Sequence, residues 1–293
     1  MRDILFGLLK KTVVLFGGLG IGRIWPFREL YHLLLSRLNP RTAAVHGHAM
    51  FLDPNDSLRL SLWGEYEPFE TRLFTSHIQS GHVVLDIGAN IGYYTLLAAR
   101  LVGPQGAVYA FEPDPDNFAL LQKNIHRNGY RNVVLKNQAV ADENGKIELF
   151  KGGENWGGHR IYDPGDSQEH ITVDAIVLDD FFKGETTDID LIKMDIEGAE
   201  VRAIQGMSTL LEKSANIKLF TEFSPAALSQ SGSSPEEYLE LLVQFGFALH
   251  FLDEERATIQ AASAGDILKF TAGQEDPANL FCTKGADLPQ RNQ

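Results

Sequence analysis

The sequence predicts an α/β fold in which a mostly parallel sheet is covered by helices on both faces. Short apolar runs rich in β-branched residues, such as residues 83–86, alternate with longer segments in which apolar residues recur every three to four positions. This alternation of strand and helix patterns is typical of a parallel sheet. The chain has 293 residues, of which 44% are hydrophobic, so it is long and apolar enough to build a large core.

Local signals indicate where the individual elements begin and end. Asp114 is a good N-cap before a helix that Gly129 can end, and Ser234 and Gly246 have the same roles for a later helix. Three further helices are predicted, at residues 31–38, 93–102 and 199–211. The predicted strands are residues 83–86, 107–111, 133–135, 147–151, 191–194, 217–222, 247–252 and 280–283, with short strands in 44–52, and the polar, glycine-rich residues 152–170 are predicted to form a long loop.

An apolar helix is predicted within residues 1–22. Its uncharged part, residues 12–22, is shorter than the roughly 20 residues that a membrane-spanning helix needs. We expect the helix to pack on the body of the protein. The alternative is an interfacial helix in peripheral contact with a membrane, whose basic residues meet anionic headgroups. Leu5, Leu8, Leu9, Val13 and Phe16 form its apolar face, and Arg2, Lys10, Lys11 and Arg23 are the basic residues.

Composition excludes some classes of partner and site. The formal net charge is -13, and an acidic surface repels phosphate backbones, so nucleic acid is not an expected partner. Cys282 is the single cysteine of the sequence, which leaves no intrachain disulfide and no cysteine-based metal site. This usage fits a reducing compartment, and we expect a cytoplasmic protein.

A glycine-bearing turn comes after the predicted strand at residues 83–86. In parallel α/β sheets, ligands bind beyond the carboxyl ends of the strands, where such turns lie. Gly88 and Gly92 allow the backbone to approach a ligand closely, but Asn90 stands where a dinucleotide-binding turn has its middle glycine. Asp86 is unfavourable beside a pyrophosphate and suits a cationic amino-acid moiety. The turn therefore favours a ligand other than a dinucleotide.

Polar residues come after the next two predicted strands. Glu112 lies 24 positions beyond Gly88 (112 − 88), where a carboxylate can accept hydrogen bonds from both ribose hydroxyls. Gln138 comes after the third strand, where it can read the edge of an adenine; a plain turn explains it equally well. Glu112 could also be a solvated residue ahead of a helix cap. The glycine turn and Glu112 together therefore carry more weight than either feature alone.

Carboxylates gather after the later strands. Asp195, Glu197 and Glu200 come after the predicted strand at 191–194, and charges at a buried strand end are unfavourable unless they are paired. Lys193 can supply that pairing to Asp195 or Glu197. Capping and salt bridging is the simpler interpretation of Glu200. Glu222 is another carboxylate at the same edge of the sheet, after the strand at 217–222.

At these motifs the sequence resembles the FkbM-type S-adenosylmethionine-dependent methyltransferases. The resemblance rests on VVLDIGANIGYY (residues 83–94), FEP (111–113) and IDLIKMDIEGAEVRAIQG (189–206), with GEYEP (64–68) and LDD (178–180) beside them. It covers about residues 45–285. It implies a class I, Rossmann-like methyltransferase fold: a mostly parallel seven-stranded sheet with a last antiparallel strand. The implied organisation is an N-terminal helical or cap segment (1–75), a methyltransferase domain (76–285) and a C-terminal tail (286–293).

The resemblance also implies the cofactor, S-adenosyl-L-methionine, and a methyl-transfer reaction. Its asparagine-containing glycine loop matches Asn90. If the acceptor is a hydroxyl, a general base helps to remove its proton. The candidate bases are Asp195, Glu222 and His159, of which the loop histidine ranks below the carboxylates. The expected cofactor-binding residues are Glu67, Asp86, Gly88, Asn90, Gly92, Glu112, Gln138 and Asp195.

The expected reaction is O-methylation of a hydroxyl on a sugar, glycan or secondary metabolite, so the partner is a small-molecule or glycan acceptor. One alternative is metal assistance, in which Asp195 and Glu222 supply oxygen ligands to a divalent cation; two ligands are few, and no metal site is assigned. Others are an NAD(P)-binding oxidoreductase, which the glycine spacing opposes, and a cofactor-binding module without catalysis. The oligomeric state considered is a homodimer.

Overall fold

The computed structural model describes residues 40–152, 158–163, 165, 169–185, 188–273 and 277–285, together with residue 5. The predicted helices at 1–22 and 31–38 and the tail at 286–293 lie outside these residues, apart from residue 5. In the part of the chain so described, no helix is long and apolar enough to cross a membrane.

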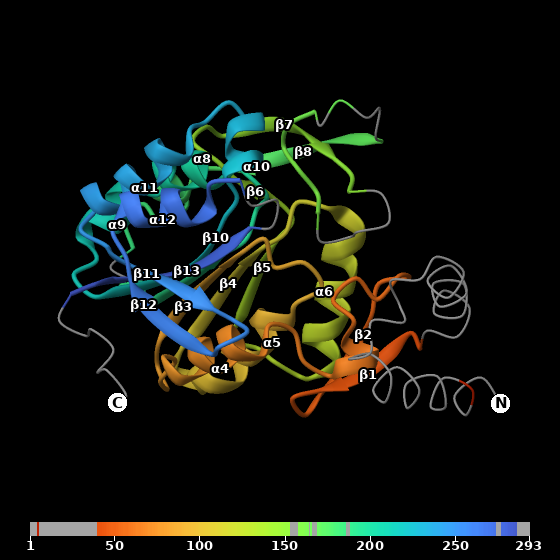
Figure 1. Ribbon diagram of the computed structural model, residues 1–293. Coiled ribbons are helices and arrows are strands. Elements are labelled where there is room, and N and C mark those ends of the chain that lie inside the picture. The colour runs from red at the N-terminus through yellow and green to blue at the C-terminus, as the bar shows by residue number, and fades with distance from the viewer. Residues whose placement is uncertain are drawn as a thin grey trace.

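The centre of the molecule is an eight-stranded sheet with the strand order β12-β11-β13-β10-β9-β3-β4-β5 (Figure 1). Neighbouring strands from β10 to β5 are parallel, whereas β13 runs antiparallel between β10 and β11. The strands are β3 (Val83–Ile87), β4 (Ala107–Phe111), β5 (Val133–Lys136), β9 (Leu191–Met194), β10 (Ile217–Phe223), β11 (Ala248–Asp253), β12 (Thr258–Ala261) and β13 (Ala278–Lys284).

This sheet confirms the α/β class and the antiparallel last strand, and it has one strand more than the seven expected. The additional strand is β12, which forms a hairpin with β11 at the edge of the sheet. Its residues 258–261 are mostly exposed, so they lack the apolar run that marks the buried strands. With β13 and β12 antiparallel to their neighbours, the sheet is mixed.

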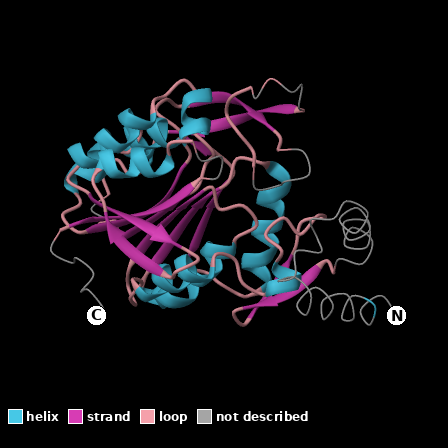
Figure 2. Ribbon diagram, in the orientation of Figure 1, coloured by secondary structure: helices cyan, strands magenta, loops and turns pink. Residues whose placement is uncertain are grey.

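Helices cover both faces of the sheet (Figure 2). Helices α8, α9, α11 and α12 lie on one face, where Leu85 and Met194 belong to the apolar core. Helices α5 and α6, with α4, lie on the other, where Val84 and Leu191 are buried. Successive residues of each inner strand point to opposite faces, so both faces are apolar. The helices are α3 (Leu60–Trp63), α4 (Pro68–Ser76), α5 (Tyr93–Val102), η3 (Gly103–Gln105), α6 (Pro115–Arg127), α7 (Leu178–Phe181), α8 (Glu200–Gln205), α9 (Ser208–Lys213), α10 (Pro225–Gln230), α11 (Pro235–Gln244) and α12 (Ala264–Thr271).

The caps expected from the sequence are present. The Asp114 side chain accepts hydrogen bonds from the backbone N–H groups of Asp116 and Asn117 at the start of α6. Ser234 and Glu237 form a capping box at the start of α11. Each such cap satisfies backbone donors that the helix itself leaves free, and contributes about 1 kcal/mol.

The helix predicted at 199–211 is instead two short helices, α8 and α9. The carbonyl of Gly206 accepts a hydrogen bond from the backbone N–H of Asp179, on α7. The Asp179 carboxylate then accepts from the backbone N–H groups of Thr209 (2.8 Å) and Leu210 (2.9 Å). These bonds end one helix and cap the next, and they come from a residue about thirty positions away, which periodicity does not reveal.

A three-stranded sheet, of order β6-β8-β7, lies beside the main sheet. It consists of β6 (Ala139–Val140), β7 (Gly145–Phe150) and β8 (His170–Ile176). The prediction of one long loop at 152–170 was too simple. Within the described part of this segment, Arg160 forms an antiparallel bridge with Phe150, and β8 begins at His170. This chain reversal brings residues 158–162 back toward the carboxyl ends of the central strands.

The N-terminal part of the described chain is attached to the sheet through α6. A hairpin of β1 (Thr42–Val45) and β2 (His48–Phe51) confirms the short strands expected there. Asn124 on α6 accepts from the backbone N–H of Phe51 and donates to the carbonyls of Phe51 (3.0 Å) and Ile91 (2.8 Å). One buried amide thereby joins the hairpin, the helix and the glycine turn. The domain boundary expected near residue 75 stays a prediction.

Candidate active site

The glycine turn connects β3 to α5, and its backbone can be built only with glycine at two positions. Gly88 has φ of 83°, and a Cβ there would lie 2.0 Å from the carbonyl oxygen of Asp195. Gly92 has φ of 94°, and its Cβ would lie 2.7 Å from Cδ1 of Leu121. Asn90 also adopts positive φ, 49°, which asparagine tolerates better than most residues. The turn therefore packs against Asp195, directly after β9, and against α6.

Asp86 is buried at the end of β3, directly before this turn. Its carboxylate accepts a hydrogen bond from the Thr95 hydroxyl on α5. Burial raises the pKa of Asp86 to about 6, although the bond from Thr95 opposes the shift. The bond braces the start of the turn, and Asp86 also lines a cavity beside it.

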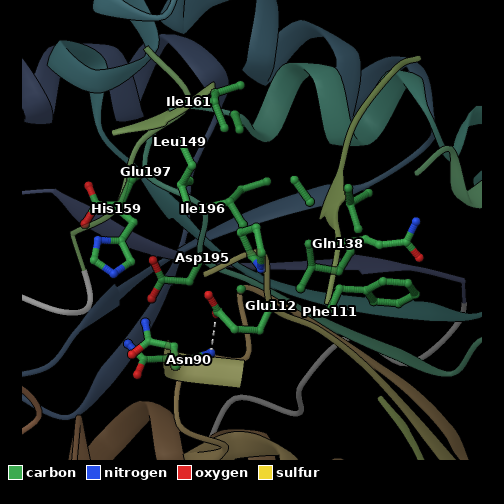
Figure 3. Close-up of a pocket in the computed structure, with 17 residues that line it drawn as sticks. Asn90, Phe111, Glu112, Gln138, Leu149, His159, Ile161, Asp195, Ile196 and Glu197 are labelled. Atoms are coloured by element: carbon green, nitrogen blue, oxygen red, sulfur yellow. Dashed lines mark hydrogen bonds between the residues drawn. The ribbon is translucent and has the colours of Figure 1, made fainter. Parts of the chain in front are cut away.

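Glu112 lies at the end of β4 and is 4% exposed. Its carboxylate accepts hydrogen bonds from the backbone N–H groups of Asn90 (2.7 Å) and Asp114 (2.9 Å), so it connects the glycine turn to the start of α6. Burial raises the pKa of Glu112 to about 8, against the lowering effect of these two bonds. Figure 3 shows Asn90, Glu112 and Asp195 around the same space.

That space is a cavity of about 550 Å³, called here the Glu112 cavity. Gln138 lines it, but in Figure 3 its side-chain amide lies on the side of the cavity opposite to His159 and Asp195. The cavity combines apolar walls with few polar groups, as small-molecule sites commonly do. Its lining residues are Ile87, Gly88, Asn90, Phe111, Glu112, Pro113, Asn117, Gln138, Ala139, Val140, Leu149, His159, Ile161, Asp195, Ile196, Glu197 and Ala199.

His159 reaches the Glu112 cavity from the segment that bridges to β7. Its Nδ1 accepts from the backbone N–H of Gly152 (3.0 Å), and its Nε2 lies 3.7 Å from Oδ2 of Asp114. Burial lowers the pKa of His159, although Asp114 opposes this, so the ring is neutral near pH 7. Two of the three candidate bases, Asp195 and His159, therefore line this cavity.

A second cavity of about 800 Å³ lies on the other side of the turn and is called the Lys193 cavity. Gly88, Asn90, Asp195 and Glu197 line both cavities, so the two meet at the glycine turn. The lining residues of the Lys193 cavity are Ser57, Leu58, Tyr66, Asp86, Gly88, Ala89, Asn90, Tyr93, Tyr94, Lys193, Asp195, Glu197 and Glu222.

Lys193 is the one basic residue among these lining residues. Its Nζ lies 3.0 Å from Oε1 of Glu70 on α4 and 3.7 Å from Oδ2 of Asp195, and 5.1 Å from the ring centroid of Tyr94. Burial alone would lower the pKa of Lys193, but Glu70 and Asp195 raise it well above its ordinary value. The pairing with Asp195 agrees with the expectation from the sequence, whereas the closer partner, Glu70, was missed.

Asp195 belongs to a group of carboxylates at the ends of β9 and β10, adjacent strands of the sheet. Glu222 Oε2 is buried and accepts no hydrogen bond from the described residues. Burial, and then the negative charges of Asp195 and Glu197, raise the pKa of Glu222 well above its ordinary value. Burial raises the pKa of Glu197 to about 7. Glu222 and Glu197 are therefore harder to ionise than exposed carboxylates.

Glu67 stands apart from the other expected cofactor-binding residues. It lines neither of these two cavities; its carboxylate accepts from Tyr94 Oη (3.1 Å) and from Asn279 Nδ2 (2.9 Å) on β13. Gly92 likewise lines neither, since it packs against Leu121. Tyr66, Tyr93 and Tyr94 of the Lys193 cavity lie within the motifs that carry the family resemblance, but no role in the site was predicted for them.

The site is suited to a neutral or cationic ligand more than to a phosphate. Carboxylates dominate the polar lining, while a dinucleotide turn would offer its amides to a pyrophosphate. Among the residues described here, no group of three or more His, Cys, Asp or Glu side chains is arranged to hold a metal ion. Fold and site together define a class I methyltransferase.

The chain belongs to the FkbM methyltransferase family: residues 86–249 match the Methyltransferase FkbM domain. S-adenosylmethionine is the methyl donor of such an enzyme. The family assignment opposes the oxidoreductase alternative and agrees with the glycine spacing.

Three curated proteins show the extent of the similarity. The hexuronic acid methyltransferase AglP of Haloferax volcanii is 27% identical over 48% of this chain and 56% of its own length. The 2-O-methyltransferase NoeI of Sinorhizobium fredii is 30% identical over 58% of this chain and 74% of its own. The 31-O-demethyl-FK506 methyltransferase FkbM of Streptomyces tacrolimicus is 42% identical over 27% of this chain and 31% of its own. Against several curated relatives that it matches, the chain spans between 22% and 57% of their length.

Proposed function

We propose that this protein is an S-adenosylmethionine-dependent O-methyltransferase that methylates a hydroxyl of a sugar, a glycan or a secondary metabolite, with Asp195 as general base. The observation that carries the proposal is the position of Asp195, which lines both the Glu112 cavity and the Lys193 cavity. A base that serves a methyl transfer has to stand where the donor and the acceptor meet.

The residues of the Glu112 cavity fit the nucleoside part of the donor. Gly88 leaves no room for a side chain beside Asp195, so the backbone itself borders the cavity. The carboxylate of Glu112 is suited to accept hydrogen bonds from the two ribose hydroxyls. Asp86, with Asn90, is suited to the cationic amino-acid end, on the side where the Lys193 cavity begins. Bound there, S-adenosylmethionine supplies an electrophilic methyl group on a sulfonium.

The residues of the Lys193 cavity fit the acceptor. As the acceptor oxygen forms its new bond to carbon, its proton passes to the carboxylate of Asp195, whose Oδ2 lies 3.7 Å from the ammonium of Lys193. Burial and the charges of Asp195 and Glu197 raise the pKa of Glu222 well above its ordinary value, and in its protonated form Glu222 can donate a hydrogen bond to the acceptor. Tyr66, Tyr94 and their neighbours limit the access of water. His159 lines the Glu112 cavity and not the Lys193 cavity, and its contact with Asp114 suits positioning.

The relatives support a hydroxyl acceptor. The names of two of them specify transfer to oxygen, and one names a hexuronic acid. An acidic surface and an acidic acceptor cavity agree with an acceptor that is not strongly anionic. A cytoplasmic location and a peripheral membrane contact remain predictions from the sequence.

The test combines turnover with cofactor binding. Purified protein is incubated with radiolabelled S-adenosylmethionine and a panel of methyl glycosides and hydroxylated metabolites, and binding of S-adenosylhomocysteine is measured by calorimetry. We expect Asp195→Asn to lower kcat by at least about a hundredfold while changing the Kd little. Glu112→Ala should have the opposite effect and weaken the binding of S-adenosylhomocysteine more than it lowers kcat. Equal losses of turnover and of cofactor affinity in Asp195→Asn would contradict its role as the base. Full activity in EDTA is expected if no divalent metal assists the reaction.

A further inference from the structure

A surface groove, called here the Trp63 groove, adjoins the Lys193 cavity. The groove encloses about 880 Å³ and shares Ser57, Leu58 and Tyr66 with the cavity. Since the same side chains line both, the groove and the cavity adjoin at these residues. The remaining lining residues of the groove are Arg59, Trp63, Glu65, Glu67 and Pro68.

The groove presents a flat apolar surface next to a cation. Trp63 is 52% exposed, which is unfavourable for an indole that serves packing alone. Arg59 is the N-cap residue of α3, with a left-handed backbone (φ of 52°), and it lines the groove together with Trp63. Its guanidinium makes no ion pair or hydrogen bond with any other residue that the structure describes. The pair offers a stacking surface beside the five N–H donors of a guanidinium.

The wall that carries these side chains is held rigidly from beneath by two buried aspartates. Asp53 accepts from the backbone N–H groups of Asn55 and Ser57, both at 2.9 Å. Asp56 accepts from those of Leu60 (2.9 Å) and Ser61 (3.0 Å). A binding surface that is ordered before its ligand arrives loses less entropy on binding. The groove is therefore a preformed site.

We propose that the Trp63 groove binds the second sugar ring of the acceptor, whose first ring is methylated in the Lys193 cavity. The apolar CH face of a pyranose ring packs on the indole of Trp63, and its hydroxyls accept hydrogen bonds from Arg59. The shared lining at Ser57 and Tyr66 places the cavity and the groove side by side, as two linked rings of one saccharide require. This inference rests on the proposed O-methyltransferase function and narrows its acceptor to a saccharide of at least two rings.

The test compares one-ring and two-ring acceptors of the same sugar. The probes are methyl glycosides of hexoses and hexuronic acids and the matching disaccharides, assayed with radiolabelled S-adenosylmethionine. We expect the best disaccharide to exceed its monosaccharide in kcat/KM by about tenfold, chiefly through a lower KM. Trp63→Ala should remove this advantage without changing kcat/KM for the monosaccharide, and Trp63→Phe should keep part of it. The matched control is Val243→Ala on α11, since Val243 is as exposed (51%) and should change neither acceptor.

The outcomes separate this inference from the proposed function. If a disaccharide is methylated but keeps its advantage in Trp63→Ala, the groove is not its subsite and the inference is wrong. An equal loss for both acceptors in that variant would indicate a structural defect and would also overturn it. If hydroxylated metabolites are methylated and no saccharide is, the enzyme is an O-methyltransferase without a sugar subsite. If nothing is methylated although S-adenosylhomocysteine binds, the proposed function itself fails.

Discussion

Replacing Glu112 with glutamine should abolish a pH dependence in the binding of the nucleoside. Burial raises the pKa of Glu112 to about 8, with Asp114 and Asp86 adding negative charge nearby. About one carboxyl in ten is then ionised at pH 7 and about nine in ten at pH 9. The ionised form accepts charge-assisted hydrogen bonds from both ribose hydroxyls, which the protonated form cannot do equally well. The affinity for the nucleoside should therefore rise about tenfold between these pH values.

The probe for this prediction is 5′-methylthioadenosine, because it has no group that titrates near neutral pH. Its Kd is measured by calorimetry from pH 6 to pH 9.5 in two buffers of different ionisation enthalpy, which also counts the protons released. Glu112→Gln keeps the shape of the side chain and should give weaker binding that does not vary with pH. A flat profile in the native protein, or the same slope in Glu112→Gln, would refute the assignment of Glu112 to the ribose.

Three further predictions concern the turn, the buried ion pair and the carboxylates. Gly88→Ala, with its Cβ 2.0 Å from a carbonyl oxygen and φ of 83°, should abolish measurable S-adenosylhomocysteine binding in calorimetry. Lys193→Met leaves Glu70 unpaired and should lower the free energy of unfolding in urea by about 3–5 kcal/mol, much of which Glu70→Leu in the same chain should restore. Because burial raises the pKa of Glu112 to about 8 and that of Glu200 to about 7, their protonated forms are favoured by folding. That stabilisation is complete below about pH 4.5 and is lost as the pH rises through 7 and 8, so urea midpoints should be higher at pH 5.5 than at pH 8.5.

Much of the central sheet could be predicted because its strands are buried on both faces. Such strands appear as short apolar runs, as at β3 and β9, and caps such as Asp114 mark the start of the next helix. The strands that were missed are β6, β8 and β12. β8 and β12 are partly exposed and lack this signal, and β6 has only two residues. Their existence depends on pairing with partners elsewhere in the chain.

The same distinction applies to the site. Gly88 and Glu112 were found because their spacing results from a strand, a turn and a helix of ordinary length. Glu70, the partner of Lys193, was not found from the sequence. It precedes Lys193 by 123 positions (193 − 70) and approaches it only through the packing of α4. The compartment that Trp63 borders was missed for the same reason. Local pattern therefore located the residues of the Glu112 cavity better than those of the Lys193 cavity.

The position of β13 has a consequence for the biosynthesis of the enzyme. This strand is the last of the described elements in the sequence, yet it lies in the interior of the sheet between β10 and β11. A nascent chain that stops before residue 278 keeps the hydrogen-bonding edge of β10 open, and open edges invite aggregation. Asn279 on the same strand holds Glu67 beside the acceptor side of the site. The sheet therefore becomes complete only after β13 has left the ribosome, and the hydrogen bond from Asn279 to Glu67 can form only then.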